Sequence, residues 1–191
     1  GTPSHANGSL DLSHLKRVGE DIGAALQSKK TSHTIVFRST TLPGTTEEVA
    51  IPILEKHSGR TVGKGLSVCY NPEFLREGTS VKDYYHPPKI VIGERNAGEG
   101  DAVEEIYAGI EAPTIRTSIK AAEMAKYSDN AFHALKVTFA NEIGNICKRI
   151  GIDSHDVMDI FCQDTKLNLS KVYLKPGFAF GGSCLPKDLR A

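Results

Sequence analysis

The chain has 191 residues, which is enough for one domain with a sizeable core or for parts of two domains. Its 23 Lys and Arg residues balance 23 Asp and Glu residues, and this neutral charge gives no support for nucleic acid as a partner. Hydrophobic residues make up 39% of the chain and charged residues 24%, which is typical of a soluble globular protein, and no apolar run is long enough to cross a membrane.

The cysteines and histidines argue against several kinds of site. Cys69, Cys147, Cys162 and Cys184 form no C-x-x-C pair, so we expect reduced thiols in a cytoplasmic protein. The seven histidines show neither H-x-x-x-H nor H-E-x-x-H spacing, so no metal site is expected. The first residues, GTPSHANGSLDLSHLK, have neither the basic nor the apolar region of a signal peptide.

Helices and strands are predicted to alternate through the first part of the chain. Helices are predicted over residues 10–29, 41–57 and 97–110. The first has apolar residues at helical spacing, and the second follows a Pro-Gly turn and begins with a Thr N-cap and acidic residues. Short apolar, β-branched runs predict strands over residues 33–40, 66–74, 89–94 and 113–118. This alternation indicates an α/β fold with a parallel sheet that carries helices on its faces.

The pattern changes after residue 117. Residues 118–151 contain no proline, and apolar residues recur every three or four positions, which predicts one long helix or two nearly collinear ones, capped by Ser118. One face of so long a helix is expected to pack on another subunit. A further helix is predicted over residues 153–164, capped by Asp153 or Ser154, and a long functional loop over residues 164–183. We therefore predict two domains, residues 1–117 and 118–191.

Cys184 is a candidate nucleophile. It lies in the run GFAFGGSCLPKD, where a helix N-terminus opened by Pro-Lys-Asp and the nearby Lys187 would both stabilise a thiolate. Asp188 could orient the reacting groups or accept a proton. The alternative is a glycine-rich turn with an inert buried cysteine.

Two carboxylates follow the strand that is expected to end at Asn71. If residues 73–77 form a helical turn, Glu73 and Glu77 share a face at the edge of the sheet where ligands of α/β proteins bind, and one of them could be a general base. The alternative, favoured by spacing alone, is a solvated acidic turn paired with Arg76.

Other polar residues could likewise have either a catalytic role or only a structural one. Thr40 and Ser39 follow a strand and could orient water or a phosphate, or they could serve only the turn. Lys126 and Asn130 are four residues apart on one helical face and could stabilise an oxyanion, or Lys126 could be a surface residue of an amphipathic helix. The sequence contains no G-x-G-x-x-G run, so the dinucleotide-binding fingerprint is absent.

Together these segments resemble the UDP-glucose/GDP-mannose dehydrogenase family of nucleotide-sugar 6-dehydrogenases. The matching runs, in order, are GTPS, FRSTTLPGT, NPEFLREG, AEMAKYSDNAFHALKVTFANEIGNI and GFAFGGSCLPKD. Within the family, residues 163–188 most resemble the branch that oxidises GDP-mannose, and the UDP-glucose branch is the alternative. The resemblance implies the C-terminal half of a Rossmann-like sheet, without the glycine-rich loop, followed by a helical central domain that dimerises through residues 118–150.

The resemblance also implies an NAD-dependent oxidation of a sugar C6 alcohol to a carboxylate, with Cys184 attacking the aldehyde to give a thiohemiacetal and then a thioester. In that scheme, Lys126 and Asn130 stabilise the oxyanions, and Asp188, Thr40 and Glu73 position or activate water, with Glu73 as the general base.

The cofactor and substrate contacts implied by the resemblance occupy several parts of the chain. The residues expected to contact NAD are Thr2, Thr40 and Glu77. The residues expected to contact the nucleotide sugar are Phe74, Leu75, Asn168, Tyr173, Lys175, Phe178 and Gly181. Position 175 is Lys where the resemblance leads us to expect Arg, and a Lys lacks the planar, bidentate grip of Arg on phosphate.

Three hypotheses follow. The first is an internal segment of a dehydrogenase that carries catalytic residues and makes no NADH without the rest of the family's fold. The second is a non-catalytic fragment that persists as a homodimer. The third, a general thiol enzyme that pairs Cys184 with His133 or His155, has no support from spacing.

Overall fold

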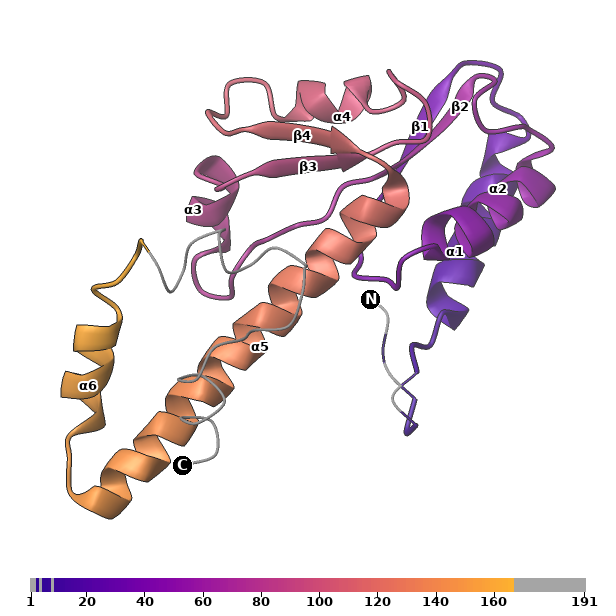
Figure 1. Ribbon diagram of the computed structural model, residues 1–191. Helices are drawn as coiled ribbons and strands as arrows, with labels where there is room; N and C mark the ends of the chain where they lie inside the picture. Colours follow the sequence, from indigo (N-terminus) through magenta and orange to yellow (C-terminus); the bar gives the residue numbers. More distant parts are fainter. Residues whose placement is uncertain (1–2, 4, 8, 167–191) are drawn as a thin grey trace, which may run out of the picture. The chain divides into compact units, whose positions relative to one another are not determined.

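The computed structural model describes residues 3, 5–7 and 9–166, which divide between two compact units, Gly1–Ala134 and Leu135–Ala191. The elements of the first unit are α1 (Ser13–Leu26), β1 (His33–Phe37), the π-helix η1 (Thr46–Ala50), α2 (Ile51–Ser58), β2 (Leu66–Tyr70), α3 (Ser80–Tyr85), β3 (Ile90–Gly93), α4 (Asp101–Ile106) and β4 (Thr114–Thr117). Helix α5 (Ile119–Ile150) begins in the first unit and ends in the second, which also contains α6 (Ser154–Phe161) (Figure 1).

Within residues 9–166, four strands form one sheet in the order β1-β2-β3-β4, and all four lie where the sequence predicts them. The pairs β1–β2 and β3–β4 are parallel. The expected parallel sheet is found for these two pairs, but β2 and β3 pair antiparallel, with Tyr70 opposite Gly93. The connection from β2 to β3 contains only the six-residue α3, which is too short to carry the chain back along the sheet as a parallel crossover does.

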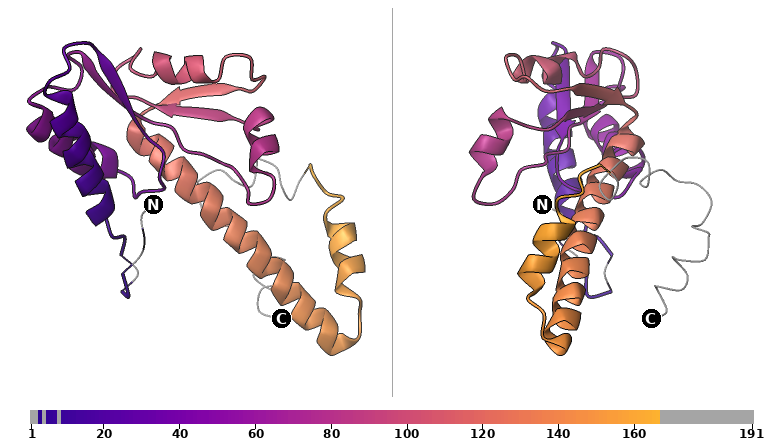
Figure 2. Two further views of the ribbon diagram at one scale, coloured as in Figure 1. Left: turned by 180° about the vertical axis from the view of Figure 1, so that it is seen from behind. Right: turned by 60° about the vertical axis from the view of Figure 1, so that its left-hand side comes forward.

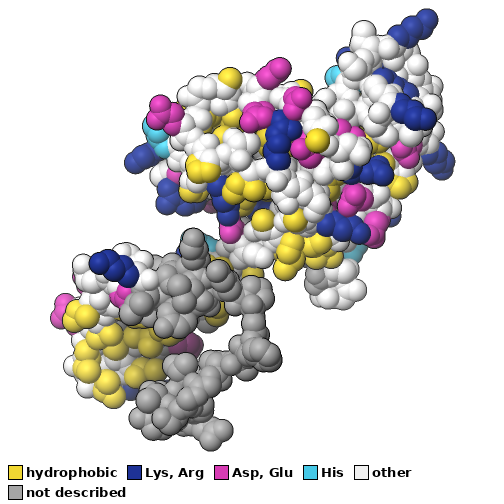
Figure 3. Space-filling view, turned by 45° about the horizontal axis from the view of Figure 1, so that its top comes forward, with side chains coloured by type: hydrophobic (Ala, Val, Ile, Leu, Met, Phe, Trp, Pro, Cys, Tyr) yellow, Lys and Arg dark blue, Asp and Glu magenta, His cyan; other side chains and the backbone are white. Residues whose placement is uncertain are grey.

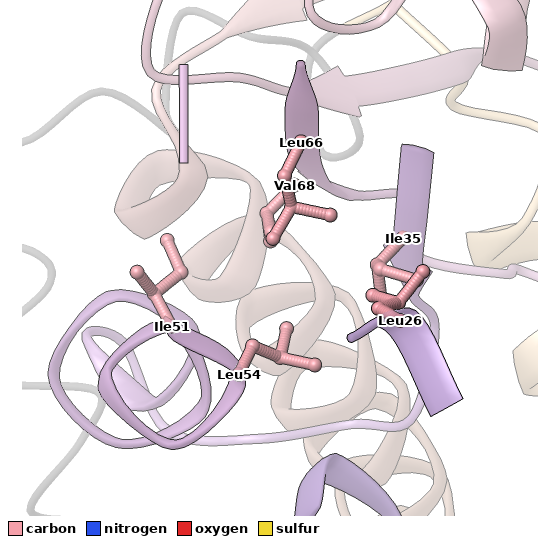
Figure 4. Packing of buried hydrophobic residues seen from close by; sticks show 6 residues of the cluster. All are labelled: Leu26, Ile35, Ile51, Leu54, Leu66 and Val68. Carbon is pink, nitrogen blue, oxygen red and sulfur yellow. The ribbon is translucent and has the colours of Figure 1, made fainter. Parts of the chain in front are cut away.

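Helices cover both faces of the sheet, as the nearly continuous burial of β2 and β3 requires. On one face, α1 and α2 lie side by side over β1 and β2 (Figure 2). Their shared core consists of Leu26, Ile35, Ile51, Leu54, Leu66 and Val68, whose side chains converge in Figure 4. On the opposite face, Val103 of α4 packs against Cys69, Ile90 and Ile92.

The first turn of α5 packs on the same face as α1 and α2. Ile119 and Ala122 contact Tyr70 and Val91 of the central strands. Gly93 permits this close approach, because a Cβ at position 93 would lie 2.8 Å from the Cβ of Ala122 and 2.9 Å from the Cα of Ile119. The start of α5 is therefore fixed against the sheet.

The hydrogen bonds at the helix N-termini can be compared with the predicted caps. The Ser118 hydroxyl accepts from the Ala121 N–H (3.3 Å), and Asp153 accepts from the His155 N–H (2.8 Å), so both caps are confirmed. Thr45 does occupy the N-cap position of η1, but its side chain makes no cap bond, because the Thr45 hydroxyl donates to the Leu42 carbonyl. The predicted helix over residues 41–57 is in fact η1 followed by α2, and α4 is shorter than the predicted 97–110.

The second unit pairs the end of α5 with α6. Helix α5 is a single helix of 32 residues that ends at Ile150, and it is followed by Gly151, whose φ of 73° suits glycine. Phe139 and Phe161 then bring the two helices together, with ring centres 5.6 Å apart. The predicted domains, residues 1–117 and 118–191, stay a prediction.

Candidate active site

Asn71 fixes the chain where it leaves β2. Its backbone N–H donates to the Phe37 carbonyl (2.9 Å), and its side-chain amide donates to the Val91 carbonyl (2.8 Å). Its side-chain oxygen accepts from the Tyr107 hydroxyl (2.7 Å). Asn71 is buried, so these bonds satisfy polar groups that are costly to leave unpaired, and they hold the following residues against both neighbouring strands.

The acidic segment, residues 73–79, does not form the helical turn over residues 73–77 on which a shared face of Glu73 and Glu77 would depend. The Glu73 carboxylate accepts from the Leu75 N–H (2.7 Å), and this local bond gives the backbone an alternative to helical hydrogen bonding. Pro72, immediately before it, has no N–H to contribute. Glu73 and Glu77 therefore do not share a helical face.

The proposed pairing of the acidic residues with Arg76 is also wrong. Arg76 instead donates to Asp83 of α3 through Nε (3.0 Å), Nη2 (2.7 Å) and its backbone N–H (3.0 Å), and the Thr79 hydroxyl donates to the same carboxylate (3.0 Å). Hydrogen bonds from the Arg76 guanidinium hold the pKa of Asp83 well below its usual range. Asp83 thus tethers the part of the acidic segment that carries Glu77.

Lys126 projects from α5 toward the acidic segment. It is 7% exposed, so the interpretation of Lys126 as a surface residue is wrong. Its Nζ lies 3.9 Å from a carboxylate oxygen of Glu73 and 5.4 Å from the centre of the Phe74 ring. Lys89 lies 4.6 Å from the centre of the same ring and donates to Asp129 (2.7 Å). A buried ammonium group in this setting is suited to stabilise negative charge on a substrate oxygen.

An open cleft lies between the acidic segment and α5. Its lining residues are Phe74, Leu75, Arg76, Glu77, Lys126, Asp129, Asn130, His133 and Ala134. Lys126 and Asn130 line the same cleft, as their four-residue spacing predicts. His133 was not predicted as a cleft residue, although it lies three residues after Asn130 and the same helical spacing points to it.

The loop after β1 carries Thr40 and is attached to α5 through Glu123, a residue that sequence reasoning missed. Glu123 is fully buried and accepts from the Thr41 hydroxyl, from the Gly44 N–H, and from both the N–H and the hydroxyl of Thr46. Because β1 and β2 are parallel, Thr40 and the acidic segment both follow strand ends at the same edge of the sheet.

The remaining predicted site residues lie outside the described residues. They are Thr2, Asn168, Tyr173, Lys175, Phe178, Gly181, Cys184 and Asp188. Among the residues that the structure does describe, no cluster of His, Cys, Asp or Glu side chains could hold a metal ion. No helix in the described part of the chain combines the length and apolar character needed to cross a membrane.

Comparison with known proteins gives consistent matches along the chain. A model described as "UDP-glucose/GDP-mannose dehydrogenase family, NAD binding domain" matches residues 1–111, and the model of the same family's central domain matches residues 120–191. The GDP-mannose 6-dehydrogenase of Pseudomonas aeruginosa is 56% identical over 191 residues, which cover all of this chain and 44% of that protein. The UDP-glucose 6-dehydrogenase of Haloferax volcanii is 42% identical over 195 residues, which cover 45% of it.

Solved structures agree with these sequences. The chain is similar to a ternary complex of GDP-mannose dehydrogenase from Pseudomonas aeruginosa, with a TM-score of 0.97 over all of this chain and 44% of that one. A UDP-glucose dehydrogenase from Pyrobaculum islandicum is 36% identical, with a TM-score of 0.82 over 98% of this chain and 42% of that one. The chain thus spans less than half the length of these relatives. Because one family model alone matches more than half of its residues, the chain belongs to the UDP-glucose/GDP-mannose dehydrogenase family.

Proposed function

We propose that this chain carries catalytic residues of an NAD-dependent nucleotide-sugar 6-dehydrogenase that oxidises GDP-mannose to GDP-mannuronate. The observation that carries the proposal is the open cleft lined by Glu77, Asn130 and the buried Lys126, with a Glu73 carboxylate oxygen 3.9 Å from the Lys126 ammonium. GDP-mannose is preferred over UDP-glucose as the substrate because identity to the GDP-mannose enzyme is 56%, against 42% for the UDP-glucose enzyme of Haloferax volcanii.

The described residues fit part of a bound dinucleotide. Thr40 and Glu77 follow parallel strands at the sheet edge where ligands of α/β proteins bind, and a hydroxyl and a carboxylate suit hydroxyl groups of a ribose. The sequence has no glycine-rich loop to hold a diphosphate, so these residues, with Thr2, would contact only one end of the cofactor. NAD supplies a hydride acceptor when it is bound.

Lys126 and Asn130 would act on the oxygen at C6. As the alcohol is oxidised, negative charge develops on this oxygen, and a preorganised ammonium group and amide in the cleft would stabilise it without having to reorient. The 3.9 Å between Lys126 Nζ and Glu73 leaves the ammonium without a short bond to that carboxylate. Its N–H donors are therefore available to a substrate oxygen in the cleft.

Cys184 would make the second oxidation possible. Its sulfur adds to the carbonyl carbon of the aldehyde, and the oxygen is protonated to give a thiohemiacetal. Loss of a hydride and a proton from this species leaves a thioester, which water then cleaves to the carboxylate and the free thiol. Glu73 would remove a proton from that water, with Asp188 and Thr40 positioning it.

The nucleotide-sugar contacts remain proposals of the same kind. Phe74 and Leu75 line the cleft and would contact the sugar. The other proposed contacts are Asn168, Tyr173, Lys175, Phe178 and Gly181.

A chimera tests the proposal. This chain would replace the 191 matching residues of the Pseudomonas aeruginosa GDP-mannose 6-dehydrogenase, and NADH formation would be followed with GDP-mannose and with UDP-glucose. We expect two NADH for each GDP-mannose, at most one after Cys184→Ser, and a loss of roughly 10²–10³ in kcat after Lys126→Met. Lys82→Met is the matched control, because Lys82 lies on α3 and does not line the cleft. A folded chimera that makes no NADH, or that loses nothing on Cys184→Ser, contradicts the proposal.

A further inference from the structure

Glu123 is a buried carboxylate that the proposed chemistry does not use. Its exposure is 0%, and burying a charged group is costly unless hydrogen bonds replace the lost water. One oxygen accepts from the Thr41 hydroxyl (3.3 Å), the Thr46 N–H (2.9 Å) and the Thr46 hydroxyl (2.7 Å). The other accepts from the Gly44 N–H (2.6 Å). Both oxygens are therefore committed to one loop.

That loop, residues 41–46, leads from β1 into η1. The two N–H donors, of Gly44 and Thr46, lie at the start of η1, where a negative charge is favourable. The side chain of Thr45 does not cap this end. Glu123, which comes from a distant part of the chain, takes the role that the local sequence leaves unfilled.

The position of Glu123 connects two parts of the proposed site. Thr40 immediately precedes the loop that Glu123 binds, and Lys126 follows Glu123 by three residues, on the same side of α5. Ile119 and Ala122 hold this end of α5 by apolar packing, which is not directional. The four hydrogen bonds are directional, so they set the rotation of α5 relative to the loop after β1.

We propose that Glu123 is a positioning residue: by binding residues 41–46, it sets the place of Lys126 relative to Glu73 and Thr40. The inference rests on the proposed function for its catalytic meaning. Lys126 depends on this support because its ammonium lies 3.9 Å from Glu73, beyond hydrogen-bond distance, so the helix determines its location. Small displacements of a catalytic group are enough to reduce the rate severely.

Lysine labelling of this chain tests the positioning without any need for activity. The chain is treated briefly with an acetylating reagent, and the modification rate of each lysine is read by peptide mass spectrometry. Glu123→Gln keeps the shape of the side chain but turns an NH₂ donor toward the N–H and hydroxyl donors of the loop. We expect Lys126 to react roughly tenfold faster in this variant, while Lys82 on α3 keeps its rate, because only local protection is lost.

Glu48→Gln is the matched control. Glu48 belongs to η1, but it is exposed and pairs with Lys120 on the surface (2.8 Å), so this variant is expected to leave the rate at Lys126 unchanged. If Glu123→Gln does not fold, Thr46→Val removes one of the four hydrogen bonds and should raise the rate at Lys126 by a smaller factor. An unchanged rate at Lys126, or equal acceleration of Lys126 and Lys82, overturns the proposal.

The chimera gives the catalytic readout. There we expect Glu123→Gln to lower kcat by about 10–100-fold while KM for GDP-mannose changes by less than about threefold, because the substrate contacts remain. A change in KM alone would overturn the catalytic part of the inference. A chimera without any activity would defeat the proposed function, and the labelling result would still decide the positioning.

Discussion

Cys69 shows how a buried position fixes the chemistry of a thiol. It lies in β2, fully buried, and its Sγ donates to the Glu99 carbonyl. Burial, and then the negative charges of Glu99 and Glu94, raise the pKa of Cys69 from 9.0 to about 12. A thiol of this kind stays protonated and inert at neutral pH, so Cys69 is a core residue rather than a nucleophile.

The raised pKa of Cys69 predicts a loss of stability at alkaline pH. Between about pH 9 and 12 the folded thiol keeps its proton while the unfolded thiol loses it, so the free energy of unfolding falls as the pH rises, by at most about 1.4 kcal/mol per pH unit. Urea unfolding of the chain and of Cys69→Ala at pH 8, 9 and 10 measures this. The variant should show the shallower decline above pH 9. Parallel declines for the two proteins would show that Cys69 does not titrate as described.

The site at residue scale was only partly predictable. Lys126 and Asn130 are four residues apart, and helical geometry alone places them on one face. The approach of Lys126 to Glu73 depends on how α5 packs against the chain after β2, and no local pattern encodes that distance. Glu123 was missed for the same reason. Glu123 directly follows the buried Ala122, and this position indicates a buried carboxylate. The residues that donate hydrogen bonds to Glu123 lie far away in the sequence.

At the scale of elements, the strands were found because their apolar runs are distinctive and the sheet is covered on both faces. The direction of β3 was not found. Alternating strands and helices suggest parallel crossovers, but the connection between β2 and β3 holds Pro72, Pro87, Pro88 and only a six-residue helix. Without a helix long enough to return along the sheet, the next strand pairs antiparallel.

The contact between β3 and α5 predicts the effect of a single methyl group. In Gly93→Ala the new Cβ would meet Ala122 and the backbone of Ile119 at less than 3.0 Å, so α5 must move or the sheet must distort. We expect a loss of about 1–3 kcal/mol in the free energy of unfolding, measured by urea denaturation.

Gly144→Ala is the control for this substitution. Gly144 lies within α5, its nearest neighbour is the Ser154 hydroxyl at 3.9 Å, and alanine there should stabilise the helix by about 0.5–1 kcal/mol. If Gly93→Ala unfolds at the same urea concentration as the unmodified chain, the packing of α5 on β3 is not as tight as the structure has it.

At the scale of the whole molecule, the apolar residues of α5 predict self-association. Met124, Leu135 and Ile146 are exposed and follow one another at intervals of about three helical turns, so they lie on one side of the helix. Hydrophobic side chains also gather on the part formed by α6 and the end of α5, at the lower left of Figure 3. Exposed apolar surface of this kind marks an interface, and we propose a homodimer through α5.

Light scattering tests the dimer. The purified chain should have the mass of a dimer at micromolar concentration, and Leu135→Glu with Ile146→Glu should give a monomer, because two charges would be buried in the interface. Val81→Glu, at an exposed apolar position on α3, should leave the dimer intact. A monomer before any substitution excludes this arrangement.

The proposed function requires two successive oxidations of GDP-mannose, the second of them through Cys184. The amount of NADH formed per GDP-mannose consumed, at completion in the chimera, measures this most directly. Oxidation of an alcohol to a carboxylate releases two hydrides, so we predict two NADH for each GDP-mannose, with GDP-mannuronate as the product. One NADH for each GDP-mannose, with the aldehyde as the product, would contradict the thioester route and the role proposed for Cys184.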